Sequence, residues 1–553
     1  MKKLFILFLF LLPFITVEAK TIHKVVNPTY IGMQHGTMEI TSVKTTEEAT
    51  TVTFRYPGNG FGYFDSNIYL VDEQGKHYGL IGQKGFSEDS LKNMKPKKKG
   101  KYELYFQPLP VGTQIFDIIE NFYDIGGSRF YGVREKDTPL KTIRTLGNNQ
   151  GEAALPDIDF KVDSVMVTGQ IKNYQSANNK FKVVRKYNSS SLENAHQRNP
   201  KTSIDENGNF CMKIEAIGPT WTYLIFSGDK NSGKSMFIPV VLYPDDHIDL
   251  QITLGENDNR TNVTYNSKQQ KDFSHLMKCA PITYVNSDVT PNQPGKDYST
   301  EYERMTPESV QKYFDDYDML ALYLSDKYDL NRVETEMLRS HLSVAVAINV
   351  IGLTNRYLIN KEKKATPKED RQMAYEKWRN SDSPYYSIAF SNIRTGSNAF
   401  LATPYWTNLF SPYNMRNIPR NEKMFNDFLI SPITPIHGNE QKEDYFKNNE
   451  VTLLYEQVLQ LMREWRQKKE DDALFEQSLL LCCIQDLRLG IPQGTLDNGI
   501  MKQSMVQVYR QYALFGNLFN HPSVVRMAST LIERRRQEIY QEQEDYRENL
   551  ESK

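Results

Sequence analysis

The sequence contains little cysteine and has no excess of charge of either sign. Four cysteines among 553 residues are too few for a scaffold held together by disulfides. The 67 Lys+Arg residues nearly match the 68 Asp+Glu residues, which leaves a net charge of −1. This balance argues against a general nucleic-acid binder, because such proteins need a basic surface to displace counterions. A mean hydropathy of −0.58 also excludes a polytopic membrane protein.

Several motifs that carry chemistry are missing from the sequence. There is no C-x-x-C, so a thioredoxin-type redox centre has no local support. There is no H-E-x-x-H and no other close histidine pair, so zinc binding has none either. Asp245-Asp246-His247 is interpreted as a turn rather than a metal site. No G-x-S-x-G elbow is present. The sequence therefore predicts no catalytic residue, no metal and no cofactor.

The N-terminus has the pattern of an export signal. Met1-Lys2-Lys3 is basic, and the run 4–17 is apolar but short and broken by Pro13. With a small residue at Ala19, this predicts a signal peptide over 1–19 that is cleaved rather than retained as an anchor. No transmembrane segment is expected after cleavage. The nearest candidate, 342–353, is interpreted as a buried helix.

The rest of the chain changes from strand patterns to helix patterns. Alternating apolar residues and a turn at 72–76 predict a β-sandwich over 20–135. A polar linker over 136–157 and a second small β-sandwich over 158–265 follow. Thr306 and Pro307 are typical of a helix start, within a helical domain expected over 266–553. The predicted fold class is a multidomain α+β protein.

The segment from Gly228 to Ser235 matches the P-loop pattern G-x-x-x-x-G-K-[ST]. A P-loop must open a helix, whose N-terminus binds the phosphates. Here the loop is followed by an apolar, β-rich run that contains Pro239. We therefore expect a β-hairpin and ordinary turn chemistry instead of a nucleotide site.

The cysteines are interpreted mainly as structural. Cys482 and Cys483 lie in a strongly apolar helical run and are expected in a core. A bridge to Cys211 or Cys279 and a redox role remain open alternatives. On the predicted strand 210–214, Cys211 alternates with apolar residues, so it is expected near solvent.

An aromatic stretch between 382 and 438 is the best candidate for ligand or partner contact. Aromatic side chains in loops can stack on sugars or anchor a peptide, but they also fill gaps between helices. Packing is the favoured interpretation, with contact as the alternative. The contact candidates are Tyr385, Tyr386, Tyr405, Trp406 and Tyr413.

Short motifs resemble exported Bacteroidetes proteins of the TlpA-like, thioredoxin-family type. The segments 106–110 and 131–133 look like their N-terminal Ig-like module. The segments 205–210 and 243–248 are similar to their small β domain, and 398–410 resembles their helical connector. The resemblance implies an Ig-like sandwich, a second small β-sandwich and an all-α domain. It covers no W-C-x-x-C thioredoxin domain, so oxidoreductase activity does not carry over.

These observations favour an exported, non-enzymatic binding or scaffold protein of the periplasm or cell surface, with a protein or glycan partner and no nucleic acid. One alternative is an accessory protein in thiol–disulfide exchange that uses Cys482, Cys483 or Cys211 with a separate thioredoxin. An unrecognised hydrolase is the other alternative.

Overall fold

The computed structural model describes most of the chain between residues 21 and 394. Beyond residue 394 it describes only the single positions 525, 529, 537, 541 and 548. Between 21 and 394 it does not describe 35–37, 59–63, 88–93, 95, 97, 124–126, 141–161, 175–180, 187–199, 218, 229–234, 255–260, 268–272, 280–301, 368–369 and 382. The predicted signal peptide and most of the predicted helical domain lie outside the described residues.

The chain divides into two compact units. The first comprises residues up to 121 together with 127–140, and the second comprises 122–126 and almost all of the chain from 141 onward. The second unit therefore includes both the later strands and the helices.

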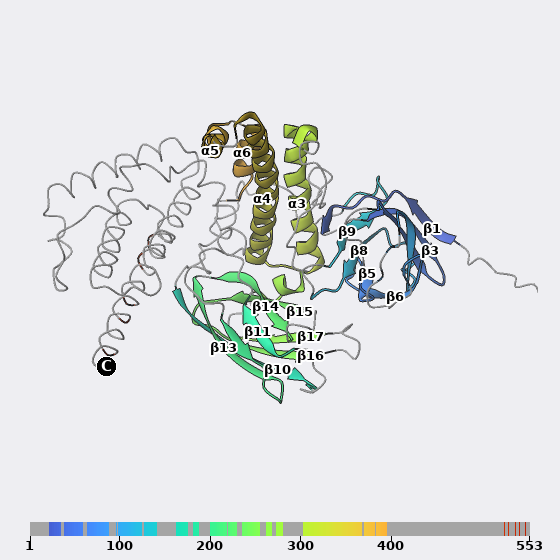
Figure 1. Ribbon diagram of the computed structural model, residues 1–553. Coiled ribbons are helices and arrows are strands. Elements are labelled where there is room, and N and C mark those ends of the chain that lie inside the picture. The colour runs from blue at the N-terminus through green and yellow to red at the C-terminus, as the bar shows by residue number, and fades with distance from the viewer. Residues whose placement is uncertain are drawn as a thin grey trace, which may run out of the picture. The chain divides into compact units, whose positions relative to one another are not determined.

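Nine strands form one antiparallel sheet in the first unit. Their order in the sheet is β1-β3-β4-β7-β6-β5-β8-β9-β2. Figure 1 labels β1, β3, β5, β6, β8 and β9 among these strands. The strands are β1 (Thr21–Val26), β2 (Gly32–Gln34), β3 (Glu39–Thr46), β4 (Thr50–Tyr56), β5 (Ile68–Asp72), β6 (His77–Lys84), β7 (Gly100–Phe106), β8 (Ile115–Glu120) and β9 (Arg129–Arg134).

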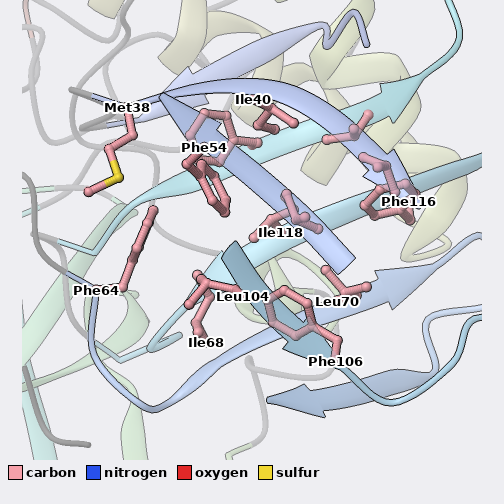
Figure 2. Packing of buried hydrophobic residues seen from close by; sticks show 14 of the residues in the cluster. Met38, Ile40, Phe54, Phe64, Ile68, Leu70, Leu104, Phe106, Phe116 and Ile118 are labelled. Carbon is pink, nitrogen blue, oxygen red and sulfur yellow. The ribbon is translucent and has the colours of Figure 1, made fainter. Parts of the chain in front are cut away.

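The core of this unit collects apolar side chains from strands that lie far apart in the sheet order. In β4, Val52 and Phe54 are fully buried while Thr51 and Thr53 are half-buried, as alternation across a strand requires. Phe54 packs against Phe64 with ring centroids 4.8 Å apart (Figure 2). Phe130 of β9 belongs to the same cluster. Residues of β4 and β9 share one core, so the sheet folds over on itself.

The predicted hairpin at 72–76 is confirmed. Strands β5 and β6 pair antiparallel, and Gly75 takes a φ of +77° in the turn between them. The carboxylate of Asp72 accepts hydrogen bonds from the backbone N–H groups of Gln74 and Lys76, and from the hydroxyl of Tyr78. One acidic side chain thus holds the turn and the start of the next strand.

Two four-stranded sheets form the β part of the second unit. Their orders are β13-β10-β16-β17 and β12-β11-β14-β15, and β10 and β16 run parallel. One apolar cluster takes buried side chains from both sheets, so they pack face to face. The strands are β10 (Val162–Lys172), β11 (Val183–Lys186), β12 (Lys201–Ser203), β13 (Asn209–Ile217), β14 (Thr220–Ser227), β15 (Ser235–Leu242), β16 (His247–Thr253) and β17 (Asn262–Asn266).

Helices follow the strands in the second unit. Helix α3 begins with a capping box in which Thr306 and Ser309 exchange hydrogen bonds, and Pro307 is the first helical residue, as predicted. Helix α4 begins with the equivalent pair Asn331 and Glu334. The helical elements are η2 (Leu276–Lys278), α3 (Pro307–Lys327), α4 (Arg332–Ala365), α5 (Arg371–Asn380) and α6 (Pro384–Ser391).

Helix α4 is the one described helix that is long and apolar enough to cross a membrane. However, 56% of its most apolar 18-residue window is buried inside the protein. Val346 and Val350 are fully buried, and Thr354 donates its hydroxyl hydrogen bond to the Val350 carbonyl within the helix. This fits the prediction of a buried helix over 342–353.

The fold class is therefore confirmed at a coarse level, as a strand-rich protein with large antiparallel sheets and a few helices.

Candidate functional site

The first two residues of the aromatic stretch lie in α6 and are buried, with Tyr385 8% and Tyr386 5% exposed. The Tyr385 hydroxyl donates to the backbone carbonyl of Met305, at a distance of 2.6 Å. The Tyr386 hydroxyl donates to the Asn355 side chain of α4. These bonds fasten α6 to the start of α3 and to α4, which favours packing for this pair. Tyr405, Trp406 and Tyr413 lie outside the described residues.

Two further tyrosines form a stack, and one of them also packs against Tyr385. Tyr302 and Tyr357 stack with ring centroids 3.9 Å apart and planes 10° from parallel. Tyr302 also meets the Tyr385 ring edge-on at 5.3 Å, and its hydroxyl lies 3.2 Å from the Ser383 hydroxyl. The sequence analysis missed this stack because its two rings come from segments 55 residues apart with no shared motif.

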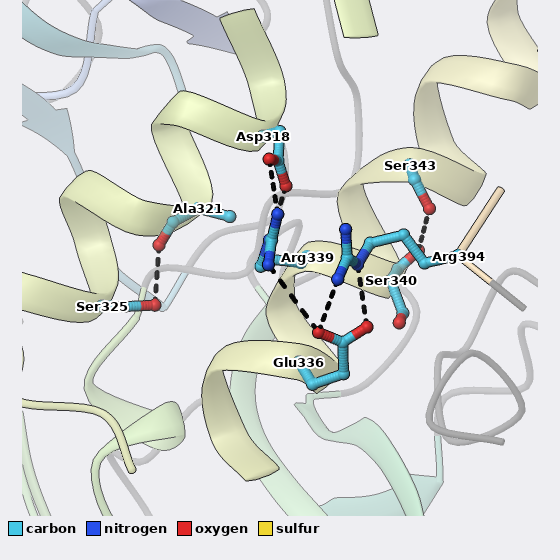
Figure 3. Close-up of polar contacts among 8 residues, drawn as sticks. All are labelled: Asp318, Ala321, Ser325, Glu336, Arg339, Ser340, Ser343 and Arg394. Carbon is cyan, nitrogen blue, oxygen red and sulfur yellow. Dashed lines mark hydrogen bonds and ion pairs between the residues drawn. The ribbon is translucent and has the colours of Figure 1, made fainter. Parts of the chain in front are cut away.

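A chain of charged side chains joins α3, α4 and the residues after α6 (Figure 3). Arg339 donates to both oxygens of Asp318, at 2.6 and 2.7 Å. Arg394 donates to both oxygens of Glu336, at 2.8 and 2.9 Å, and Glu336 lies 4.0 Å from the Arg339 guanidinium. Burial alone lowers the pKa of Arg339, but the hydrogen bonds and charge of Asp318 and the charge of Glu336 outweigh burial and raise it.

This arrangement satisfies each partly buried charge with a partner of opposite sign. Two bidentate arginine–carboxylate pairs fix the positions of α3 and of residue 394 relative to α4. They contribute more to this specific geometry than to the stability of the fold. Arginine side chains stay positively charged near neutral pH and do not act as acids or bases there. The network therefore has a structural role, which is to hold the helices in one arrangement.

Trp221 of β14 and His341 of α4 bring the sheet and the helices of the second unit together. Their rings lie 5.0 Å apart at 65°, and both side chains are essentially fully buried. Among the described residues, the indole N–H of Trp221 and the hydroxyl of neighbouring Ser340 have no hydrogen-bond partner. A contact between residues 120 positions apart could not be predicted from the local sequence pattern.

The strands on either side of the P-loop-like segment form a β-hairpin, as predicted, and residues 229–234 of the segment lie outside the described residues. Strands β14 and β15 pair antiparallel along their whole length, and Ser227 lies opposite Ser235. The P-loop-like segment is therefore followed by the strand β15. Within this strand, the carbonyl of Pro239 accepts a hydrogen bond from the Tyr265 hydroxyl. A helix N-terminus, which a phosphate-binding P-loop needs, does not follow the segment.

The prediction of a turn at 245–247 is also confirmed. Asp245 has a φ of +67°, and the N–H of Asp246 donates to the Tyr243 carbonyl. The Asp246 carboxylate accepts from the His247 N–H at 2.9 Å and from the Ser267 hydroxyl at 2.6 Å. Across the part of the chain that the structure describes, no group of three or more His, Cys, Asp or Glu side chains is placed to hold a metal ion.

The two described cysteines are free and differ in exposure. Cys211 is exposed on β13, as expected, and its Sγ lies 3.6 Å from Sδ of Met166 on β10. Cys279 is fully buried, and burial together with the charge of Glu334 raises the pKa of its thiol far above the ordinary value. A thiol that resists ionisation is a poor nucleophile, so Cys279 is unsuited to disulfide exchange. Cys482 and Cys483 lie outside the described residues.

The buried carboxylates share one role. All six that the structure describes accept hydrogen bonds from backbone N–H groups, hydroxyls or arginines within the fold. They are Asp72, Asp117, Glu120, Asp246, Glu334 and Glu336. These donors hold turns, strand ends and helix ends in place. The acids therefore act as structural clamps.

Glu120 shows the strongest consequence of such burial. Its two oxygens accept from the N–H groups of Asp65 at 2.5 Å and Ser128 at 2.7 Å. Burial nevertheless dominates and raises its pKa to about 7, against the opposing effect of these hydrogen bonds. The group titrates near neutral pH, but both oxygens face the backbone of its own unit.

Comparisons of the chain with family models, curated proteins and solved structures gave no significant match.

Proposed function

We propose that this chain is an exported, non-enzymatic binding or scaffold protein of the periplasm or cell surface. In its finer architecture it comprises an Ig-like β-sandwich, a second small β-sandwich and an all-α domain that continues beyond the described helices. This architecture resembles the non-catalytic N-terminal and helical-connector regions of TlpA-like proteins. The partner is an envelope protein or a glycan.

The observation that carries this proposal is the use of the six buried carboxylates. A general acid or base must present a titratable group to a substrate. In the described part of the chain, the buried carboxylates are directed at donors of the fold itself. Glu334, for example, accepts three backbone N–H groups, from His275, Leu276 and Asn331. Such use supports a rigid framework that presents surfaces.

The ion-pair network supports the same role. Arg394 follows α6, and its bidentate pair with Glu336 ties this point of the chain to α4. The aromatic residues Tyr405, Trp406 and Tyr413 follow within 20 positions. A chain held at residue 394 gives these three later aromatic residues a fixed point of attachment, which supports their contact with a partner.

Two measurements test the proposal. The full chain is expressed in a bacterial host, and its N-terminus and cell fraction are determined by mass spectrometry and fractionation. We expect a mature chain that begins near residue 20 in the envelope fraction. An intact Met1 on a cytoplasmic chain would contradict export.

The second measurement is cross-linking of the exported protein in intact cells, followed by identification of the linked partners. We expect the double variant Tyr405→Ala/Trp406→Ala to lose a partner that the wild type cross-links. Val111→Ala is the matched control, because Val111 is an exposed apolar side chain of the first unit. Identical partners for all three proteins would exclude this surface.

A further inference from the structure

Three side chains that prefer soft metals share the outward face of one sheet. Cys211 lies on β13, Met166 on the neighbouring β10, and His247 on β16, the next strand along. The pairing places Met166 directly opposite His247. It also places Cys211 opposite Thr168, two residues from Met166 on the same face.

The alternation of the strands confirms that these side chains point away from the core. Val167 pairs with Met212 on one side and with Ile248 on the other, and all three are buried. Their neighbours along each strand therefore point outward. Cys211 and His247 are exposed, and Met166 is half-buried.

The two sulfur atoms are at the separation that a shared metal ion requires. Sγ of Cys211 lies 3.6 Å from Sδ of Met166. With metal–sulfur bonds of about 2.3 Å, this separation corresponds to an S–metal–S angle of about 100°. Such an angle suits tetrahedral or flattened trigonal coordination.

The histidine is held on the same face by Thr168. Nε2 of His247 lies 2.9 Å from the hydroxyl of Thr168, the residue that faces Cys211 across the strand pair. The Thr168 hydroxyl also donates to Asp249, at 3.4 Å. Thr168 thus fixes the orientation of the imidazole on this face of the sheet, in the way that outer hydrogen bonds commonly orient a ligating histidine.

The donor atoms of the three side chains indicate which metal would bind. Thiolate and thioether sulfurs are soft donors that favour Cu(I), and imidazole also suits copper, whereas Ca²⁺ and Mg²⁺ require oxygen. The charged residues that the register places beside the three ligands are Lys213, opposite Met166, and Asp249, opposite Thr168.

We propose that Cys211, Met166 and His247 form a surface binding site for Cu(I). The search for groups of His, Cys, Asp and Glu does not reveal this site, because one of its three ligands is a methionine. All three residues lie on paired strands of one sheet, so the strand pairing fixes their backbone positions. It shares no residue with the aromatic stretch, and its occupancy does not depend on the proposed binding function.

The test uses the full chain under anaerobic conditions, with Cu(I) supplied by a bicinchoninate buffer. Alkylation of Cys211 by iodoacetamide is followed by peptide mass spectrometry, so copper bound at another cysteine does not alter the readout. We expect Cu(I) to protect Cys211 in the wild type. Met166→Leu and His247→Asn should each raise the copper concentration needed for protection more than about tenfold, since even outer-shell partners change metal affinity by that factor.

Met373→Leu is the matched control, because Met373 is an exposed methionine on α5 that lies outside the trio. It should protect as the wild type does. Thermal melting checks that each variant is folded, and both ligand substitutions lie on the outward face, where they remove no core contact. Absence of protection in the wild type would overturn the proposal. Unchanged protection in either Met166→Leu or His247→Asn would also overturn it, because the thiol would then bind copper without that ligand.

Discussion

Glu334 of α4 accepts a hydrogen bond from the backbone N–H of Leu276 at 2.7 Å, across 58 residues of sequence. The same oxygen accepts from the His275 N–H at 2.9 Å, and the other oxygen accepts from Asn331 at the helix start. One carboxylate therefore caps α4 and also holds η2, the short helix that precedes the buried Cys279.

Replacement of Glu334 by alanine should destabilise the second unit by about 3 kcal/mol, because it leaves buried backbone donors without an acceptor. A urea titration followed by circular dichroism measures this change. Glu303→Ala is the control, since Glu303 is an exposed acid of the same unit. It should alter the free energy of unfolding by less than about 0.5 kcal/mol. Equal effects of the two substitutions would contradict the clamp role of Glu334.

Glu120 should make the stability of the first unit depend on pH between 4.5 and 7. Its pKa is raised from 4.5 to about 7 in the folded protein, chiefly by burial. The folded state thus holds a proton that the unfolded state releases. The stabilising contribution is complete below pH 4.5 and is lost as the pH rises through 7. The loss is on the order of 3 kcal/mol.

Glu120→Gln removes this titration. Its free energy of unfolding should vary less steeply than that of the wild type from pH 4.5 to 7, whatever its absolute stability at pH 5. Glu135→Gln, at an exposed acid of the same unit, should keep the wild-type slope. The idea fails if Glu120→Gln and the wild type give parallel curves.

The elements that sequence could predict are those governed by neighbours along the chain. The alternation around Val52 and Phe54, the turn after Asp72 and the cap at Thr306 each depend on fewer than eight consecutive residues, and each is present as expected. Asn331 and Glu334 form a capping box that the same reasoning could have found, since a capping residue is followed three positions later by Glu.

The contacts that determine the candidate sites depend on distant parts of the chain. Nothing local indicates that Trp221 meets His341, or that Tyr302 stacks on Tyr357. The alternation of β13 predicted that Cys211 faces solvent. It could not show that Met166 is the neighbour, because a pattern along one strand gives the face of a side chain but not the strand that lies beside it.

The cysteines should separate into two classes when labelled with iodoacetamide. Cys211 is exposed and should react in the native protein, whereas Cys279 is buried with a raised pKa and should react only in denaturant. Peptide mass spectrometry assigns each thiol. Reaction of Cys279 under native conditions would contradict its burial.

The same experiment decides the redox alternative. If Cys482 and Cys483 label only after unfolding, they belong to a core and cannot exchange disulfides with a separate thioredoxin. Native reaction of both would favour the accessory redox function over the scaffold function.

Alanine substitutions at Gly75 and Gly208 compare the cost of a positive φ alone with the cost of a positive φ combined with a steric clash. Both have a positive φ, of +83° and +77°. A Cβ at Gly208 would lie 2.5 Å from the Ile171 carbonyl oxygen and 2.6 Å from Cβ of Tyr174, whereas a Cβ at Gly75 would meet nothing within 4 Å. Gly75→Ala should therefore cost about 1 kcal/mol, from the left-handed backbone alone. Gly208→Ala adds a clash with backbone and should cost about 3 kcal/mol or more. Urea titration of the unit that carries each glycine measures the two costs, and similar values would show that the chain beside Gly208 moves aside freely.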